Sequence, residues 1–210
     1  MTAKGHVFLV DDDQEVRHSM ADVLRHLGYG VSDFESATSF LQQVQRCSPA
    51  VLVLDMRMPQ MTGLDLQKAL LEQNWTMPVI YMSGDSQSQE IIDAMKFGAF
   101  DFLWKPVAHT QLIQIIDKGL ALDAQRHAEQ TRFNHVAKLY QSLSVKEQEI
   151  LSLMLLGHSN KAIAALKNVM ADTVKKHRAQ IMSKMEVNSL PELLALCDGA
   201  FPTENVVLKP

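Results

Sequence analysis

The sequence predicts an α/β domain with a doubly wound, five-stranded parallel sheet, followed by a small all-α domain. Two observations support the first part: short apolar runs alternate with longer amphipathic stretches up to about residue 121, and the runs themselves are almost uninterrupted. Such runs are typical of strands buried on both faces of a parallel sheet, and the amphipathic stretches are typical of connecting helices. The third observation is that only helical patterns follow residue 143. A chain of 210 residues accommodates two such domains.

The predicted strands and helices of the first domain alternate in regular order. The expected strands are 7–10, 31–34, 51–54, 78–82 and 101–104, of which 31–34 is the weakest and is similar to an edge strand. Helical spacing is clearest in 15–27, 63–73 and 87–97. Five strand–helix repeats with right-handed crossovers form a doubly wound sheet. In that architecture a ligand site lies beyond the carboxyl ends of the strands.

The junction between the domains also carries a helical signal. Residues 120–142 are rich in Ala, Gln, Arg, His and Glu and contain neither Pro nor Gly. A new helix then begins at Ser144, because Ser144-Val145-Lys146-Glu147 has the pattern of a capping box. We therefore predict a first domain at 1–121, a helical linker at 122–142, a second domain at 143–200 and an irregular tail at 201–210.

Charge is distributed unevenly along the chain. The formal net charge is −4. Residues 1–143 hold 12 Lys and Arg against 17 Asp and Glu, whereas residues 160–185 hold six basic residues and one acid, Asp172. A short basic stretch in an acidic protein indicates a polyanionic partner at that place.

Neither membrane insertion nor disulfide bonding is indicated. No apolar run approaches the roughly 20 residues that span a bilayer, and the N-terminus lacks the apolar core of a signal peptide. We therefore expect a cytoplasmic protein with no membrane partner. Cys47 and Cys197 have no metal-ligand spacing around them, and we expect both thiols to be reduced.

Polar residues stand immediately after four of the predicted strands. They are Asp11, Asp12 and Asp13 after the first strand, Asp55 after the third, Ser83 after the fourth and Lys105 after the fifth. Because the carboxyl ends of parallel strands meet at one edge of the sheet, these side chains would converge. Gathered carboxylates repel one another unless a cation lies among them, and hard oxygen ligands favour Mg²⁺. One carboxylate then remains as a nucleophile toward phosphorus, with the lysine and the serine hydroxyl as ligands of the phosphoryl oxygens.

Each of these residues also has a purely structural interpretation. Asp12 and Asp13 could cap the next helix and interact with its dipole. Asp55 and Ser83 could be turn residues, and Lys105 could be a solvated surface lysine. These interpretations do not explain why all of the residues stand at the correct strand ends. A phosphoryl-transfer site is therefore the favoured hypothesis.

Four segments resemble the receiver domain of bacterial response regulators, and the likeness extends over nearly all of residues 5–121. They are Phe8-Leu9-Val10-Asp11-Asp12-Asp13, Leu54-Asp55-Met56-Arg57-Met58-Pro59 with Met61 and Gly63, Tyr81-Met82-Ser83-Gly84, and Gly98-Ala99 with Asp101-Phe102-Leu103 and Lys105-Pro106. The resemblance implies a flavodoxin-like strand order, 2-1-3-4-5. It also implies that Asp55 accepts a phosphoryl group from a phosphohistidine on a sensor histidine kinase.

The resemblance further implies a magnesium site. The carboxylates of Asp12 and Asp55 would hold Mg²⁺, together with Asp11 through a water and the backbone carbonyl of Arg57.

Phosphatases with a nucleophilic aspartate commonly carry a second acid two residues later. Arg57 occupies that place and cannot donate a proton at neutral pH. A turnover enzyme is therefore disfavoured, and only slow self-dephosphorylation is expected.

Three further roles follow from the same resemblance. Ser83 and Lys105 would bind the phosphoryl oxygens. Phe102, at a position that is often Tyr in receivers, would rotate inward as Ser83 moves toward the phosphoryl group. Asp13 lies outside this set, and we expect it to cap the first helix.

The second domain shows a short helix, a tight turn and a longer helix, which is the order of a helix-turn-helix. We expect helices at 145–156, 161–166 and 171–185. Projection of the third helix places three apolar residues, Val174, Ile181 and Met185, on one face. The opposite face and its flanks carry Asp172, Lys175, Lys176, Ala179, Gln180 and Ser183. Such a helix fits the major groove of DNA, although a charged helix face can also be merely solvated.

The segments of this domain resemble the LuxR-type DNA-binding domain. They are Leu143-Ser144 with Glu147 and Ile150-Leu151, Gly157 with Ser159-Asn160-Lys161 and Ile163-Ala164, Thr173-Val174-Lys175 with His177-Arg178-Ala179, Ile181-Met182 and Lys184-Met185, and Asn188-Ser189-Leu190-Pro191-Glu192-Leu193-Leu194. With the receiver, this combination is identified as a member of the NarL/FixJ family, closest to its FixJ subgroup. The likeness implies a four-helix domain whose fourth helix forms dimers.

The family resemblance implies a set of DNA contacts and partners. Bases would be contacted by Lys175, Lys176 and Ala179, and phosphates by Lys161, Thr173, Arg178 and Lys184. The partners would be double-stranded promoter DNA, a second copy of the chain on phosphorylation, and RNA polymerase. Met170 departs from the family pattern, since Ser or Thr often caps the recognition helix there. The alternative to a DNA-binding regulator is a receiver whose helical domain binds only protein or RNA.

Overall fold

The computed structural model describes residues 4–85 and 87–199 and divides the chain into two compact units, Met1–Ala128 and Glu129–Pro210. The tail expected at 201–210 lies outside the described residues, as does the last residue of the predicted second domain. Among the described helices, none is both long and apolar enough to cross a lipid bilayer.

The first unit is built on a five-stranded sheet in which every pair of neighbouring strands is parallel. The strands are β1 (His6–Val10), β2 (Gly30–Phe34), β3 (Ala50–Asp55), β4 (Val79–Ser83) and β5 (Asp101–Trp104). Their order is β2-β1-β3-β4-β5, which confirms both the predicted fold class and the predicted strand order. The register pairs Asp55 with Met82 and Ser83 with Trp104. The strands therefore end at a common edge.

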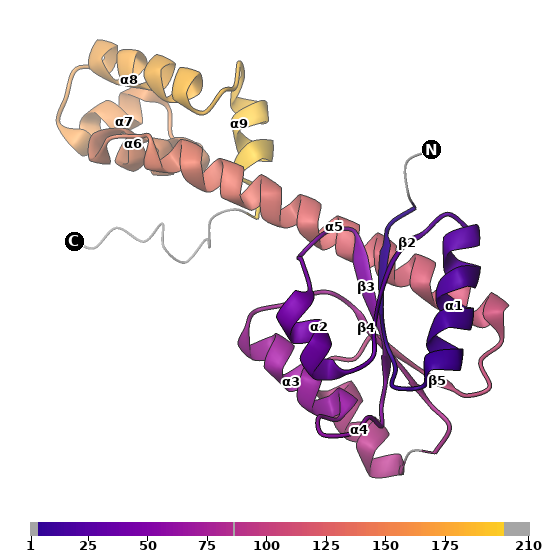
Figure 1. The fold of residues 1–210 in the computed structure, drawn as a ribbon. Helices are drawn as coiled ribbons and strands as arrows, with labels where there is room; N and C mark the ends of the chain where they lie inside the picture. The colour runs from indigo at the N-terminus through magenta and orange to yellow at the C-terminus, as the bar shows by residue number, and fades with distance from the viewer. Residues whose placement is uncertain (1–3, 86, 200–210) are drawn as a thin grey trace. The chain divides into compact units, whose positions relative to one another are not determined.

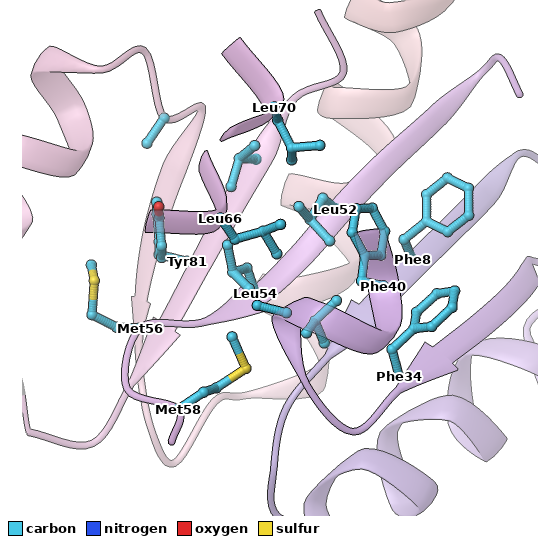
Figure 2. Packing of buried hydrophobic residues seen from close by; sticks show 14 of the residues in the cluster. Phe8, Phe34, Phe40, Leu52, Leu54, Met56, Met58, Leu66, Leu70 and Tyr81 are labelled. Atoms are coloured by element: carbon cyan, nitrogen blue, oxygen red, sulfur yellow. The ribbon is translucent and has the colours of Figure 1, made fainter. Parts of the chain in front are cut away.

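Helices cover both faces of the sheet (Figure 1). They are α1 (Gln14–His26), α2 (Ala37–Gln43), α3 (Gly63–Glu72), α4 (Ser88–Lys96) and α5 (His109–Gln141). The core on the α2–α4 side contains packed aromatic rings from Phe8, Phe34 and Phe40 (Figure 2). The core on the other side is formed with α1 and the first part of α5, through residues such as Leu24 and Ile116. Both faces of the central strands are therefore buried, as their apolar sequence predicts.

The two edge strands are less buried than the central ones. The edge position predicted for 31–34 is confirmed, whereas the prediction that 101–104 is buried on both faces is wrong. Every residue of β3 and β4 is buried, whereas most of β2 is only half-buried. Trp104, at the end of β5, is 54% exposed. The difference follows from the strand order, because β2 and β5 each have a neighbour on one side only.

The second unit is helical. Its helices, besides the end of α5, are α6 (Val145–Leu155), α7 (Asn160–Lys167), α8 (Ala171–Lys184) and α9 (Leu190–Cys197). Ser144 begins α6 with the predicted capping box, formed with Glu147. Val136, from the end of α5, is fully buried in the core of this unit together with Val174 and Ile181 of α8 and Met185, which directly follows α8. The predicted inner face of α8 is confirmed.

Candidate functional site

The carboxyl edge of the sheet brings three of the predicted pocket residues into direct contact. Asp11 directly follows β1, Asp55 ends β3 and Lys105 directly follows β5. The Lys105 Nζ lies 2.8 Å from Asp11 Oδ2 and 3.2 Å from Asp55 Oδ2. Asp11 and Asp55 are buried, and Lys105 is half-buried. The ammonium therefore compensates two carboxylates that would otherwise repel each other.

The environment of these groups shifts their pKa values. Burial raises the pKa of Asp55 above its ordinary value, while the charge of Lys105 acts against this shift. The neighbouring Asp11 adds to the rise. Burial alone would lower the pKa of Lys105, but hydrogen bonds and charge from Asp11 and Asp55 reverse that effect and raise it. Lys105 is thus a fixed positive charge beside the Asp55 carboxylate.

The pocket offers a set of oxygen ligands suited to a divalent cation. One carboxylate oxygen each from Asp11, Asp12 and Asp55 lie within 4.8 Å of one another. Asp12 is exposed, so the cluster opens to solvent on its side. The backbone N–H of Arg57 lies 3.5 Å from Asp55 Oδ1, which brings the Arg57 backbone next to the same carboxylate. Hard carboxylate oxygens at this spacing fit Mg²⁺.

Ser83 lies on β4, the strand next to that of Asp55, and Phe102 lies on β5, one strand further out. Ser83 ends β4 and is buried, and its Oγ accepts a hydrogen bond from the backbone N–H of Asp85 at 3.3 Å. Its carbonyl accepts a bond from the N–H of Lys105 at 2.8 Å, which ties the two strand ends together. Phe102 is half-buried, and its ring packs edge-on against that of Trp104 with the centroids 5.1 Å apart.

Asp13 has the structural role that the sequence predicts. Its Oδ1 accepts hydrogen bonds from the backbone N–H groups of Glu15 and Val16 at 2.9 and 3.2 Å, so it caps α1. Asp13 therefore stands beside the acidic cluster without belonging to it.

Two further residues contribute to the pocket in ways that the sequence did not predict. Arg17 on α1 is buried, and its Nη1 donates to the carbonyl oxygen of Asp11 at 2.6 Å, which fixes the turn that carries the acidic residues. The position of Arg17 on the inward face of an amphipathic helix is the feature of the sequence that could have indicated this role. Gly63 is the second: a Cβ there would lie 2.4 Å from the carbonyl oxygen of Asp55, so only glycine allows α3 to begin so close to the acceptor.

The second unit presents a helix with one buried and one polar face. Val174 and Ile181 of α8 are buried, whereas Lys175, Lys176 and Ala179 are exposed. Helix α7 precedes α8 and is separated from it by a short turn that contains Asn168 in the left-handed conformation. This arrangement is that of a helix-turn-helix, with α8 in the place of the recognition helix.

Comparisons with known proteins agree with both parts of the molecule. Residues 7–117 match the response regulator receiver domain, and residues 141–197 match the luxR family of bacterial regulatory proteins. The chain is 36% identical to the response regulator protein TodT of Pseudomonas putida, over 91% of this chain and 85% of TodT. It is 34% identical to the transcriptional regulatory protein FixJ of Bradyrhizobium diazoefficiens, over 93% of this chain and 96% of FixJ.

The chain belongs to the NarL/FixJ family of response regulators.

Solved structures support the same conclusion. The structure of the response regulator StyR, which is 37% identical, matches with a TM-score of 0.86 over 94% of this chain and all of StyR. Full-length FixJ, which is 33% identical, matches with a TM-score of 0.59 over 95% of this chain and 98% of FixJ. The protein is therefore a two-component transcription regulator in which a receiver is joined to a LuxR-type DNA-binding domain.

In this response regulator the residues predicted to contact DNA differ in exposure and in pairing. Lys161, Lys175, Lys176 and Ala179 are exposed, and Thr173 and Arg178 are half-buried. Lys184 differs from these, because its Nζ lies 2.7 Å from Glu147 Oε2 on α6. His177 is half-buried, and within the described structure its Nδ1 is buried without a hydrogen-bond partner. That placement indicates a packing role for His177.

Proposed function

We propose that Asp55 is the phosphoryl acceptor of this response regulator and that its phosphorylation promotes sequence-specific DNA binding. The observation that carries the proposal is the position of Lys105 Nζ between Asp55 and Asp11, at 3.2 and 2.8 Å. A buried carboxylate beside a fixed positive charge is arranged for nucleophilic attack on phosphorus, with the cation ready to stabilise the added negative charge.

The transfer proceeds from a phosphohistidine of a sensor histidine kinase. An Asp55 carboxylate oxygen attacks phosphorus, the P–N bond breaks, and its electron pair stays on the histidine nitrogen. The ammonium of Lys105 then pairs with a phosphoryl oxygen, and the hydroxyl of Ser83 donates to another. Bound Mg²⁺ would neutralise charge on the phosphoryl oxygens. Its ligands would be Asp12, Asp55, the Arg57 carbonyl and, through water, Asp11.

The product is expected to be a switch state and not the intermediate of a turnover enzyme. Arg57 stands where a phosphatase with a nucleophilic aspartate carries its second acid. Its guanidinium lies 3.4 Å from Asp85 and 3.3 Å from Glu90. An arginine cannot act as the general acid that a multiple-turnover phosphatase would need. Slow self-dephosphorylation would return the regulator to its resting state.

Phosphorylation would act on the surface formed by α4, β5 and α5. Movement of Ser83 toward the phosphoryl group would draw Phe102 inward and change its packing against Trp104. This surface exposes Ile92, Met95 and Trp104, and exposed apolar groups of this kind support association with a second copy. We propose that the phosphorylated protein forms a homodimer in this way.

DNA binding is assigned to α7 and α8. Lys175, Lys176 and Ala179 would contact bases, while Lys161, Thr173 and Arg178 would contact phosphates. Exposure of the lysines and alanine supports these roles. Lys184 would contact phosphate only by leaving Glu147. A dimer would engage paired half-sites in promoter DNA, and regulation would then pass to RNA polymerase in the cytoplasm.

The phosphoryl acceptor is tested by intact-mass measurement after incubation with Mg²⁺ and acetyl phosphate. Wild type should gain one phosphoryl group, whereas Asp55→Asn should gain none. Asp22→Ala is the matched control, because Asp22 is an exposed carboxylate on α1 outside the pocket. Equal labelling of wild type and Asp55→Asn would overturn the assignment. A receiver that only relays to protein or RNA would be labelled on Asp55 but would select no DNA sequence.

A further inference from the structure

The end of α7 and the turn before α8 carry exposed apolar side chains. Leu166, near the end of α7, is 58% exposed, and Val169, in the turn, is 41% exposed. Met170, directly before α8, is 75% exposed. Exposed apolar side chains clustered at one place on a soluble domain indicate a contact with another molecule.

Met170 is unfavourable at its position in the isolated protein. It occupies the N-cap of α8, and its side chain makes no capping hydrogen bond. The N-caps of α6, α7 and α9 are all serines whose Oγ accepts a backbone N–H: Ser144, Ser159 and Ser189. Met170 therefore neither caps its helix nor buries its side chain, which leaves the side chain available for a contact outside the chain.

The charged residues of α8 point to DNA as that contact. Lys175 and Lys176, one to two turns further along α8, are exposed, and positive side chains on a recognition helix complement the phosphate backbone. The exposed Asp172, in the first turn of α8, carries a carboxylate, which can accept from the N4 amino group of cytosine. The N-terminal residues of such a helix reach base edges in the major groove. Among the groups that base pairs display there, the apolar one is the 5-methyl group of thymine.

We propose that Met170 is a specificity-determining residue whose side chain packs against the 5-methyl group of a thymine in each half-site. This inference rests on the proposed DNA binding by α8. The unbranched thioether of methionine is flexible and polarisable, which suits it to contact a methyl group at the floor of the groove. A serine or threonine at position 170 would cap the helix but would lack this apolar contact.

The test begins with selection of bound duplexes from a random-sequence library by the phosphorylated full-length protein. Each thymine of the selected site is then replaced singly by deoxyuridine, which removes only the 5-methyl group. Affinities are measured at one salt concentration for wild type, Met170→Ala and Val145→Ala. Val145 is the matched control, since it is 71% exposed and lies at the start of α6. Circular dichroism establishes that all three proteins are folded.

Wild type and Val145→Ala should lose about fourfold in affinity when the contacted methyl group is removed, as expected for burial of one methyl group. Met170→Ala should lose less than about twofold at that thymine and keep its sensitivity elsewhere. The inference is overturned if no thymine is methyl-sensitive in wild type, or if Met170→Ala keeps the full loss; DNA binding by α8 would stand in both cases. Failure to enrich any sequence would overturn the proposed function itself.

Discussion

Lys184 Nζ lies 2.7 Å from Glu147 Oε2, and the same carboxylate oxygen accepts the backbone N–H of Ser144 at 2.7 Å. One carboxylate thus closes the capping box of α6 and fixes the end of α8. The hydrogen bond from Lys184, followed by that from Ser144, lowers the pKa of Glu147 to about 2. The recognition helix is therefore positioned by a charge pair at one end, while its other end carries the uncapped Met170.

This pair predicts how the stability of the DNA-binding domain depends on pH. Because the folded-state pKa of Glu147 is about 2 and its ordinary value is 4.5, the contribution is complete above about pH 4.5 and is lost as the pH falls toward 2. Urea unfolding followed at several pH values should show this loss in wild type. In Glu147→Gln the same pH range should produce a smaller decrease; equal decreases in both proteins would contradict the assignment.

Removal of the charge pair should cost more than removal of a surface pair. Glu147→Gln should lower the free energy of unfolding by about 1–3 kcal/mol, because Glu147 is buried and hydrogen-bonded to a charged partner. Glu149→Gln breaks the more exposed contact with Lys167, at 2.6 Å, and should cost less than about 1 kcal/mol. Urea titration of both variants at neutral pH gives the comparison.

Replacement of the unusual N-cap should stabilise the protein. Met170→Ser supplies an acceptor for the first free N–H groups of α8 and should raise the free energy of unfolding by about 1 kcal/mol. Ser159→Ala removes a cap in which Oγ accepts the N–H of Ala162 at 3.3 Å, and should lower it by about the same amount. A neutral or destabilising Met170→Ser would show that Met170 makes a stabilising contact within the folded chain.

Mg²⁺ should stabilise the receiver through the acidic cluster. At ten times its dissociation constant the ion should add about 1.4 kcal/mol to the free energy of unfolding. Asp12→Asn and Asp55→Asn should reduce this gain, whereas Asp13→Asn should keep it, because Asp13 caps α1. Thermal unfolding with and without Mg²⁺ measures the effect. A gain of equal size in Asp12→Asn would contradict the proposed ligand set.

Replacement of Gly63 by a larger residue should destabilise the receiver for steric reasons. A Cβ added at Gly63 would lie 2.4 Å from the carbonyl oxygen of Asp55, whereas a Cβ added at Gly84 would lie 3.9 Å from Lys105 Cβ. Gly63→Ala should therefore destabilise the receiver by about 1–3 kcal/mol and slow labelling of Asp55, while Gly84→Ala should be much milder. Urea unfolding and the rate of mass increase with acetyl phosphate provide the two readouts.

The fold and the members of the pocket could be predicted because both depend on local signals. Apolar runs mark the central strands, and the polar residues Asp11, Asp55 and Lys105 stand at their ends, so parallel pairing brings them together. The polar residues at the predicted strand ends are therefore sufficient to locate the pocket. The exposure of Trp104 at the edge was not predicted, since a short apolar run does not specify how many neighbours a strand has.

Pairings between distant side chains could not be predicted. Arg17 donates to the carbonyl of Asp11, and Lys184 pairs with Glu147 across 37 residues. The family resemblance implied a phosphate contact for Lys184 but could not show which carboxylate lies within its reach. Such pairs depend on how helices pack in three dimensions, and a single sequence carries no periodic signal for them.

Phosphorylation of Asp55 is expected to increase the affinity of the protein for DNA. The direct measurement is the affinity of the full-length protein for a selected duplex at one salt concentration, before and after treatment with acetyl phosphate and Mg²⁺. Wild type should bind about 5- to 150-fold more tightly after treatment, the usual range of coupling between two sites, while Asp55→Asn should not change. Equal affinity of labelled and unlabelled wild type, or the same increase in Asp55→Asn, would contradict the account.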